Sequence, residues 1–230
     1  MHQIVFAISI VFVTVVIYYM CVKLYKRYPY PFFIPVITTS VALIILLVSC
    51  NMSYDDYMIG GKWINALLGP GVVALAYPLY NNRKVLVQNI APILTGVCIG
   101  SLLGMTSGIL FVEMLGGNHD LVLSVIPKSI TTPVALQLTD TLGGIPSMTA
   151  IFVMIAGISG VVLGPLILKL VRISSYVGKG IALGSASHAL GTARTMEYGE
   201  PAVSMSSVSM TLSALLGTVF GPIIAWVFQL

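Results

Sequence analysis

The stretch LVLSVIPKSITTPVALQLT, residues 121–139, is apolar apart from one lysine and a few hydroxyl and amide side chains. Pro127 and Pro133 interrupt it, because proline lacks the backbone N–H that a continuous helix needs. Lys128 is its only charged residue. Such a break at membrane depth is tolerated only where protein or a wet cavity satisfies the freed backbone groups. The stretch therefore predicts a broken helix inside a polytopic membrane protein.

The composition of the whole chain supports the same class. Hydrophobic residues make up 57% of the 230 residues and charged residues only 8%, whereas a soluble domain carries about 25% charged residues. This excludes a soluble globular domain and a disordered chain. The net charge of +4 is too sparse for a phosphate-binding face and excludes a nucleic-acid binder. We expect an all-α, polytopic integral membrane protein with a single transmembrane domain over residues 1–230.

The membrane segments are expected in the apolar runs that carry no charge. We expect about six to eight membrane segments. Two or more of them are expected to be helices broken by proline and glycine. The first run lacks a cleavage site and is expected to be a retained helix. Lys23, Lys26 and Arg27 follow it, so the positive-inside rule places this loop in the cytoplasm and the N-terminus outside. The apolar runs are residues 4–22, 32–49, 85–112, 141–168 and 202–230.

A second broken segment, residues 63–82, contains Pro70 and Pro78. It precedes a glycine-rich run, as residues 121–139 do, and such pairs are typical of transporters with internal repeats. The alternative is coincidence, because the two units share little sequence. In the first of these runs glycine recurs every fourth residue, which predicts a helix face that another backbone approaches closely. These glycines are Gly96, Gly100, Gly104 and Gly108.

The topology of the broken segments stays open at this stage. Basic patches occur at residues 23–27, 83–84 and 169–179. If all three are cytoplasmic, the segment around Lys128 must enter the membrane and return on the same side. If every segment crosses fully, one patch violates the positive-inside rule.

Lys128 is the first candidate site residue, because a lysine at membrane depth costs several kcal/mol and marks a functional site by default. The helix break exposes backbone N–H groups, which together with the lysine suit an anion. The alternative is a lysine that snorkels to the interface or pairs with an acidic residue elsewhere. Three neighbouring hydroxyls would add donors for a carboxylate: Ser129, Thr131 and Thr132.

The run GSASHALGTAR, residues 184–194, is the second candidate region. It is slim and rich in hydroxyls, as expected beside a narrow wet cavity. His188 titrates near neutral pH and is a candidate for proton coupling, as is Glu197. The alternatives are a histidine hydrogen-bonded between helices and an Arg194 paired with Glu197 or Glu200. The candidate substrate-binding side chains here are Ser187, His188, Thr192 and Arg194.

No enzyme site is indicated. Ser187 and His188 are adjacent, and adjacent side chains do not face each other on a helix. The sequence has no nucleotide-binding GK[ST] loop, no HExxH and no cluster of metal ligands. We expect no enzymatic activity, no cofactor and no metal. The three cysteines lack metal-binding spacing and are interpreted as packing residues: Cys21, Cys50 and Cys98.

Four runs resemble the LrgB/CidB family of bacterial membrane proteins: ALAYPLY at 74–80, PKSITTPVA at 127–135, GGIP at 143–146 and GSASHALGTAR at 184–194. The resemblance covers nearly the whole chain. It implies a multi-pass protein of the bacterial plasma membrane, with a holin-like or antiholin-like role in murein hydrolase export and cell lysis. It also implies a small holin-like partner of the LrgA/CidA type. Relatives, including a plastid glycolate/glycerate transporter, resemble carriers of small carboxylates such as pyruvate.

The residues and the resemblance together indicate two candidate functions. The first is a secondary carrier for a small monocarboxylate, with a proton as the candidate coupling ion. The alternative is a holin-like or antiholin-like pore component or regulator without a transport cycle. It would act by oligomerising with its partner through the face formed by Gly96, Gly100 and Gly104. A homo-oligomer is expected in either case.

Overall fold

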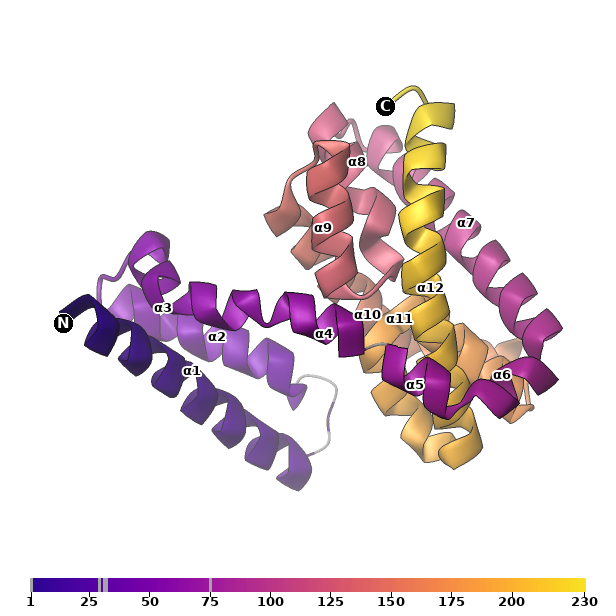
Figure 1. Ribbon diagram of the computed structural model, residues 1–230, viewed down its shortest axis with the longest axis horizontal. Coiled ribbons are helices and arrows are strands. Elements are labelled where there is room, and N and C mark those ends of the chain that lie inside the picture. The colour runs from indigo at the N-terminus through magenta and orange to yellow at the C-terminus, as the bar shows by residue number, and fades with distance from the viewer. Residues whose placement is uncertain (1, 29, 31–32, 75) are drawn as a thin grey trace. The chain divides into compact units, whose positions relative to one another are not determined.

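Figure 1 shows the computed structural model, which describes residues 2–28, 30, 33–74 and 76–230. Every regular element within these residues is a helix, which confirms the all-α prediction. The chain divides into two compact units, Met1–Gly71 and Val72–Leu230, and each is described by itself. The prediction of a single domain stays a prediction.

Four of the described helices are long and apolar enough to cross a membrane. They confirm a multi-pass membrane protein with helical spans. They are α1 (His2–Arg27), α7 (Ile90–Met114), α10 (Pro146–Leu170) and α12 (Glu200–Val227). A fifth apolar helix, α2 (Pro35–Ser49), is shorter; the start of the predicted span over residues 32–49 lies outside the described residues.

The N-terminal unit packs α2 and α3 (Tyr54–Ala66) against α1. Gly60 of α3 lets the two backbones touch, because a Cβ there would lie 2.7 Å from the carbonyl oxygen of Ala7. Helix α3 begins with a capping box between Ser53 and Asp56. The Ser53 side chain, and then its backbone N–H, donate to the Asp56 carboxylate and hold the pKa of that carboxyl below its usual value.

The predicted broken segment at residues 63–82 forms short helices: α4 (Leu68–Ala74), α5 (Ala76–Asn81) and then α6 (Arg83–Gln88). Pro70 lies in the first turn of α4, where a missing N–H costs no hydrogen bond, and the break itself falls at Leu67. Pro78 lies in α5, and its side chain is outside the described part of the chain.

The segment around Lys128 also breaks, and it turns back on itself. It forms α8 (His119–Val125), the short 3₁₀ helix η2 (Ile126–Ser129) and α9 (Thr132–Leu142). Pro127 lies in η2 and Pro133 in the first turn of α9, with extended backbone between them. After α9 the chain returns to α8, because the Ile145 N–H donates to Ser124 Oγ at 2.7 Å. Residues 119–142 therefore form a helical hairpin, here the first hairpin. That it enters the membrane and returns on the same side stays a prediction.

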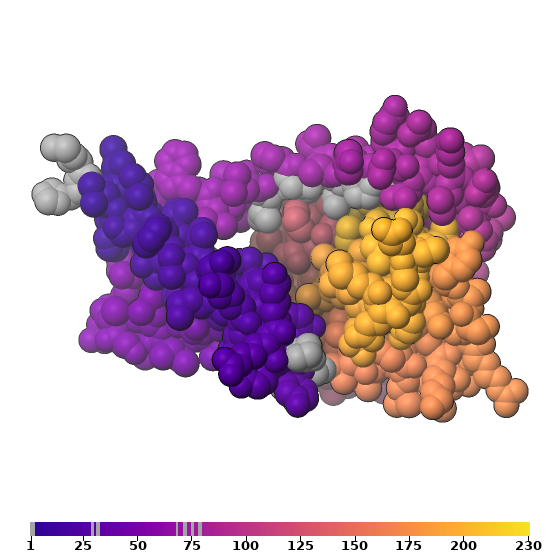
Figure 2. Space-filling view, turned by 90° about the horizontal axis from the view of Figure 1, so that it is seen from below, coloured from indigo at the N-terminus to yellow at the C-terminus, as the bar shows by residue number. Residues whose placement is uncertain are grey.

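A second hairpin, residues 176–194, is formed by α11 (Tyr176–Arg194). The helix reverses at His188, whose φ of 43° and ψ of −132° are not helical. Beyond this turn the chain doubles back, because a Cβ on Gly191 would lie 2.0 Å from the carbonyl oxygen of Leu183. Gly184 and Thr192, on the two arms, both contact Ser206 of α12. In Figure 2, α12 in yellow lies beside orange residues, and α11 packs against it.

Glycines on α7 and α10 allow both hairpins to pack closely. On α7, a Cβ on Gly96 would meet Ile181 of the second hairpin at 2.7 Å, and one on Gly108 would meet Lys128 of the first hairpin at 3.0 Å. On α10, Gly157 contacts His188 and Gly164 contacts Leu183. Along α7 the contacts run from the second hairpin to the first, and along α10 they run from the turn of the second hairpin back towards its start. Helices α7 and α10 therefore run in opposite directions. The two hairpins insert between these helices from opposite ends.

In the C-terminal unit a long helix is followed by a hairpin twice, α7 by the first hairpin and α10 by the second. The second hairpin carries no proline at its turn, so the proline pattern did not predict it. The repeat that pairs residues 63–82 with residues 121–139 stays a prediction.

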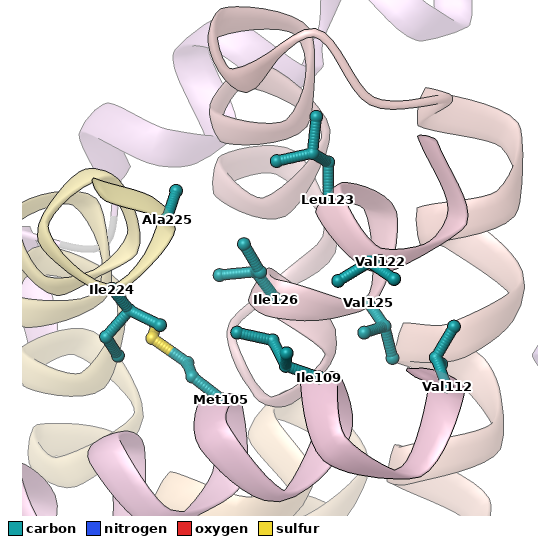
Figure 3. Close-up of a cluster of buried hydrophobic side chains, with 9 residues drawn as sticks. All are labelled: Met105, Ile109, Val112, Val122, Leu123, Val125, Ile126, Ile224 and Ala225. Carbon is teal, nitrogen blue, oxygen red and sulfur yellow. The ribbon is translucent and has the colours of Figure 1, made fainter. Parts of the chain in front are cut away.

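Figure 3 shows the apolar cluster that holds the first hairpin against α7 and α12. In lipid, apolar burial gives little driving force, so close packing of these side chains stabilises the contact. Hydroxyls add interhelical hydrogen bonds, such as Thr192 Oγ1 with Ser206 Oγ at 2.9 Å. The buried members of the cluster are Met105, Ile109, Val112, Val122, Leu123, Val125, Ile126, Ile224 and Ala225.

Candidate functional site

A cavity of about 720 Å³ lies where the two hairpins meet between α7 and α10. We call it the hairpin cavity. Its walls are mostly apolar and include Phe111, Phe152 and Leu163. Two of the polar groups predicted from the sequence line it, Lys128 from the first hairpin and Ser187 from the second.

Lys128 is half-buried, and its Nζ donates a hydrogen bond of 2.5 Å to the carbonyl oxygen of Gly104 on α7. Its methylene chain passes over Gly108, where a Cβ would lie 3.0 Å from Cε. Among the residues that the structure describes, no carboxylate lies within ion-pair distance of this ammonium group. The described residues therefore do not show the predicted alternative, in which Lys128 pairs with an acidic residue.

Ser187 is fully buried, one residue before the turn of the second hairpin. Its Oγ packs on Gly160 of α10, where a Cβ would lie only 1.7 Å from it. Within the described part of the chain this hydroxyl finds no hydrogen-bond partner. An unpaired buried hydroxyl costs about 1–3 kcal/mol. Because Gly160 covers this oxygen, a ligand in the cavity would reach it only after the second hairpin moves away from α10.

His188 forms the turn of the second hairpin but faces α10, and it is not among the residues that line the cavity. Its Nε2 lies 3.0 Å from the carbonyl oxygen of Val153, and the side chain is 5% exposed. This is the interhelical hydrogen bond that the sequence left as the alternative. The positive φ of His188 is strained for a residue with a Cβ. The hydrogen bond to Val153 therefore helps to stabilise this strained turn. Proton coupling through His188 stays a prediction.

The other predicted residues lie around the cavity and do not line it. Arg194 pairs with Glu197 of η3 (Thr195–Tyr198), after the second hairpin has returned. Thr192 bonds to Ser206 of α12. In the first hairpin, Ser129 contacts Gly104, and Thr131 and Thr132 begin α9. Of the predicted set, Lys128 and Ser187 therefore line the same cavity.

Sequence reasoning missed several polar groups near the hairpins. Ser107 and Ser159 line the hairpin cavity from α7 and α10. Buried hydroxyls also occur along α12, and the available signal was the density of serine in a charge-free span. These buried α12 residues are Ser206, Ser209, Thr211 and Ser213. Among the described residues, no group of three or more His, Cys, Asp or Glu side chains is placed to hold a metal ion.

Sequence comparison bears on this arrangement directly. The sequence model of the LrgB-like family matches residues 14–227, which include both hairpins and the whole cavity. The chain belongs to the LrgB-like family. No solved structure matches it.

Three similar proteins cover between 93% and 100% of the chain. A protein of Bacillus subtilis (strain 168) with the name uncharacterized protein YxaC is 60% identical over 230 residues, all of both chains. The holin-like protein CidB of Staphylococcus aureus (strain Mu50) is 36% identical over 228 residues, 99% of this chain and 100% of CidB. An uncharacterized protein of Haemophilus influenzae (strain Rd) is 38% identical over 213 residues, 93% of this chain and 92% of its own.

Proposed function

We propose that this LrgB-like protein is a secondary carrier, not an enzyme, for small monocarboxylates such as pyruvate. The observation that carries the proposal is Lys128, a half-buried ammonium without a carboxylate partner among the described residues, in a cavity where two hairpins meet. A carboxylate entering this cavity would neutralise the lysine and accept a hydrogen bond from its ammonium group. Charge-assisted hydrogen bonds of this kind are roughly twice as strong as neutral ones.

The arrangement of the hairpins suits alternating access. Each hairpin enters between α7 and α10 from one side, so each one separates the cavity from that side. Carriers built from inverted repeats bind substrate near the bilayer midplane, beside discontinuous helices. Gly104 and Gly108, which contact the first hairpin, lie in the second half of the 25-residue α7, well inside the span. A small shift of either hairpin along these glycine faces would open the cavity to one side.

The charges of the C-terminal unit favour one orientation. Because α7 and α10 run oppositely, Arg83 and Lys84 before α7 lie on the same side as Lys169 and Arg172 after α10. By the positive-inside rule we place this side in the cytoplasm. The first hairpin then enters from outside and the second from the cytoplasm. We assign the protein to the bacterial plasma membrane, with its N-terminus outside.

The physiological role proposed with this activity is control of murein hydrolase activity and cell lysis, together with a small holin-like LrgA/CidA-type partner. A pore component without a transport cycle is the alternative, in keeping with the name holin-like protein CidB. The face predicted for oligomerisation is not free for that purpose, because Gly96, Gly100 and Gly104 contact the chain's own hairpins. A pore would have to assemble through another surface.

Uptake of labelled pyruvate into proteoliposomes tests the carrier. We expect saturable uptake and accelerated exchange when unlabelled pyruvate is preloaded, because a carrier returns more readily with substrate bound. The protein is measured alone and with its small partner. Absence of uptake in both preparations would contradict the proposal, and non-saturable leakage of pyruvate together with an unrelated dye would favour the pore.

A further inference from the structure

The hairpin cavity is much larger than a three-carbon acid needs. Its volume of about 720 Å³ falls within the range of about 300–1,000 Å³ typical of sites for drug-sized ligands. Its walls offer apolar contact along α7 and α10, for example from Phe111, Phe152 and Leu163. The space beyond Lys128 therefore suits a ligand with a long apolar part.

The same walls connect the cavity with the surface that faces lipid. Phe111 is 64% exposed, Ile155 58% and Ile167 51%, and all three also line the cavity. Each belongs to a helix long enough to cross the membrane. An acyl chain in the bilayer can therefore reach the cavity sideways, between α7 and α10, without passing through water.

The charge in the cavity selects the head of such a ligand. Within the part of the chain that the structure describes, Lys128 supplies one positive charge that no carboxylate neutralises. One ammonium group matches a single carboxylate. A phospholipid fits less well, because its headgroup stays at the interface, about 15 Å from the middle of a hydrocarbon core about 30 Å thick.

We propose that the hairpin cavity binds a free fatty acid, with its carboxylate at Lys128 and its acyl chain between α7 and α10, and that this occupancy excludes the small substrate. Binding of the fatty acid needs only the cavity and the lysine. Exclusion of the substrate rests in addition on the proposed carrier function. The protein would then respond to the fatty-acid content of its membrane by losing transport.

Photolabelling tests the binding. The probe is dodecanoate carrying a diazirine near its methyl end, added to the protein in phosphatidylcholine nanodiscs, and mass spectrometry locates the label. We expect label on α7 and α10 around Phe111 and Phe152, displaced by unlabelled dodecanoate and not by dodecanol. Lys128→Gln should lower this label at least about tenfold, the loss typical of one charge-assisted contact.

Lys62→Gln is the matched control, because Lys62 lies beside another apolar cavity, between α1 and α3 in the N-terminal unit. It should leave the label on α7 and α10 unchanged. Leu163→Trp, which fills the hairpin cavity and keeps the lysine, should block labelling even if Lys128→Gln folds poorly. Label that persists in both Lys128→Gln and Leu163→Trp overturns the proposal, and so does displacement by phosphatidylglycerol but not by dodecanoate.

The outcomes separate this inference from the carrier proposal. Lys128-dependent labelling without pyruvate uptake would support the fatty-acid site and contradict the carrier. Pyruvate uptake with labelling that does not depend on Lys128 would support the carrier and contradict the fatty-acid site. If both hold, dodecanoate should raise the apparent KM for pyruvate and leave the maximal rate unchanged; a lower maximal rate at constant KM would contradict competition for one cavity.

Discussion

A Lys128→Gln protein is expected to take up labelled pyruvate at least about tenfold more slowly than the native chain at low substrate concentration. A hydrogen bond to a charged group contributes about 1.5–3 kcal/mol, and each 1.4 kcal/mol is about tenfold in affinity. Glutamine has an N–H donor, on a side chain one bond shorter, and adds no bulk over Gly108. The loss would therefore come from the missing positive charge, and it should appear mainly in KM.

Lys169→Gln is the matched control for this experiment. Lys169 is an exposed lysine in the last turn of α10 and does not line the hairpin cavity. Its replacement should leave uptake unchanged, and both variants should unfold near the native temperature. Full uptake by Lys128→Gln at low substrate would show that the carboxylate does not bind at this lysine.

Gly191→Ala is expected to destabilise the second hairpin and to abolish uptake. The new Cβ would lie 2.0 Å from the Leu183 carbonyl oxygen and 2.7 Å from Ser187 Cβ, so the two arms must separate. Overpacking of this kind costs about 1–3 kcal/mol, and contact with backbone leaves little room to relax. A chain of 150–250 residues loses about 2–4 °C in Tm for each kcal/mol, which thermal unfolding in detergent would detect.

Gly69→Ala provides the comparison for Gly191→Ala. Gly69 also lies in a helix, but a Cβ there meets nothing within 4 Å. Alanine should therefore be neutral or stabilising at this position, since it favours the helix by about 0.5–1 kcal/mol over glycine. An unchanged Tm and normal uptake in Gly191→Ala would contradict the close return of the second hairpin.

Some of this architecture could be predicted from residue chemistry alone. Scarce charges identify a membrane protein, because a water-facing surface cannot be built from so few. Pro127 and Pro133 identify the break around Lys128, because each removes a backbone donor. The four-residue glycine spacing on α7 predicted a close approach, and the structure shows what approaches: Gly96 and Gly108 contact two different hairpins.

The second hairpin could not be predicted in the same way. Its turn falls on His188, a residue with a Cβ at positive φ, where a glycine would be the usual signal. The turn is held by tertiary contacts, including the bond from His188 to Val153 on α10. These contacts cannot be predicted from the local sequence. The same reversal of the chain at His188 places Ser187 at the cavity and Arg194 away from it. The positions of both residues could therefore not be predicted either.

The most direct measurement is an electron cryomicroscopy structure of the protein in nanodiscs with and without pyruvate. The carrier proposal predicts density for a small carboxylate within hydrogen-bond distance of Lys128 Nζ, present only in the pyruvate sample and absent in Lys128→Gln. Pyruvate density elsewhere in the chain, or a hairpin cavity that looks the same in both samples at saturating pyruvate, would contradict it.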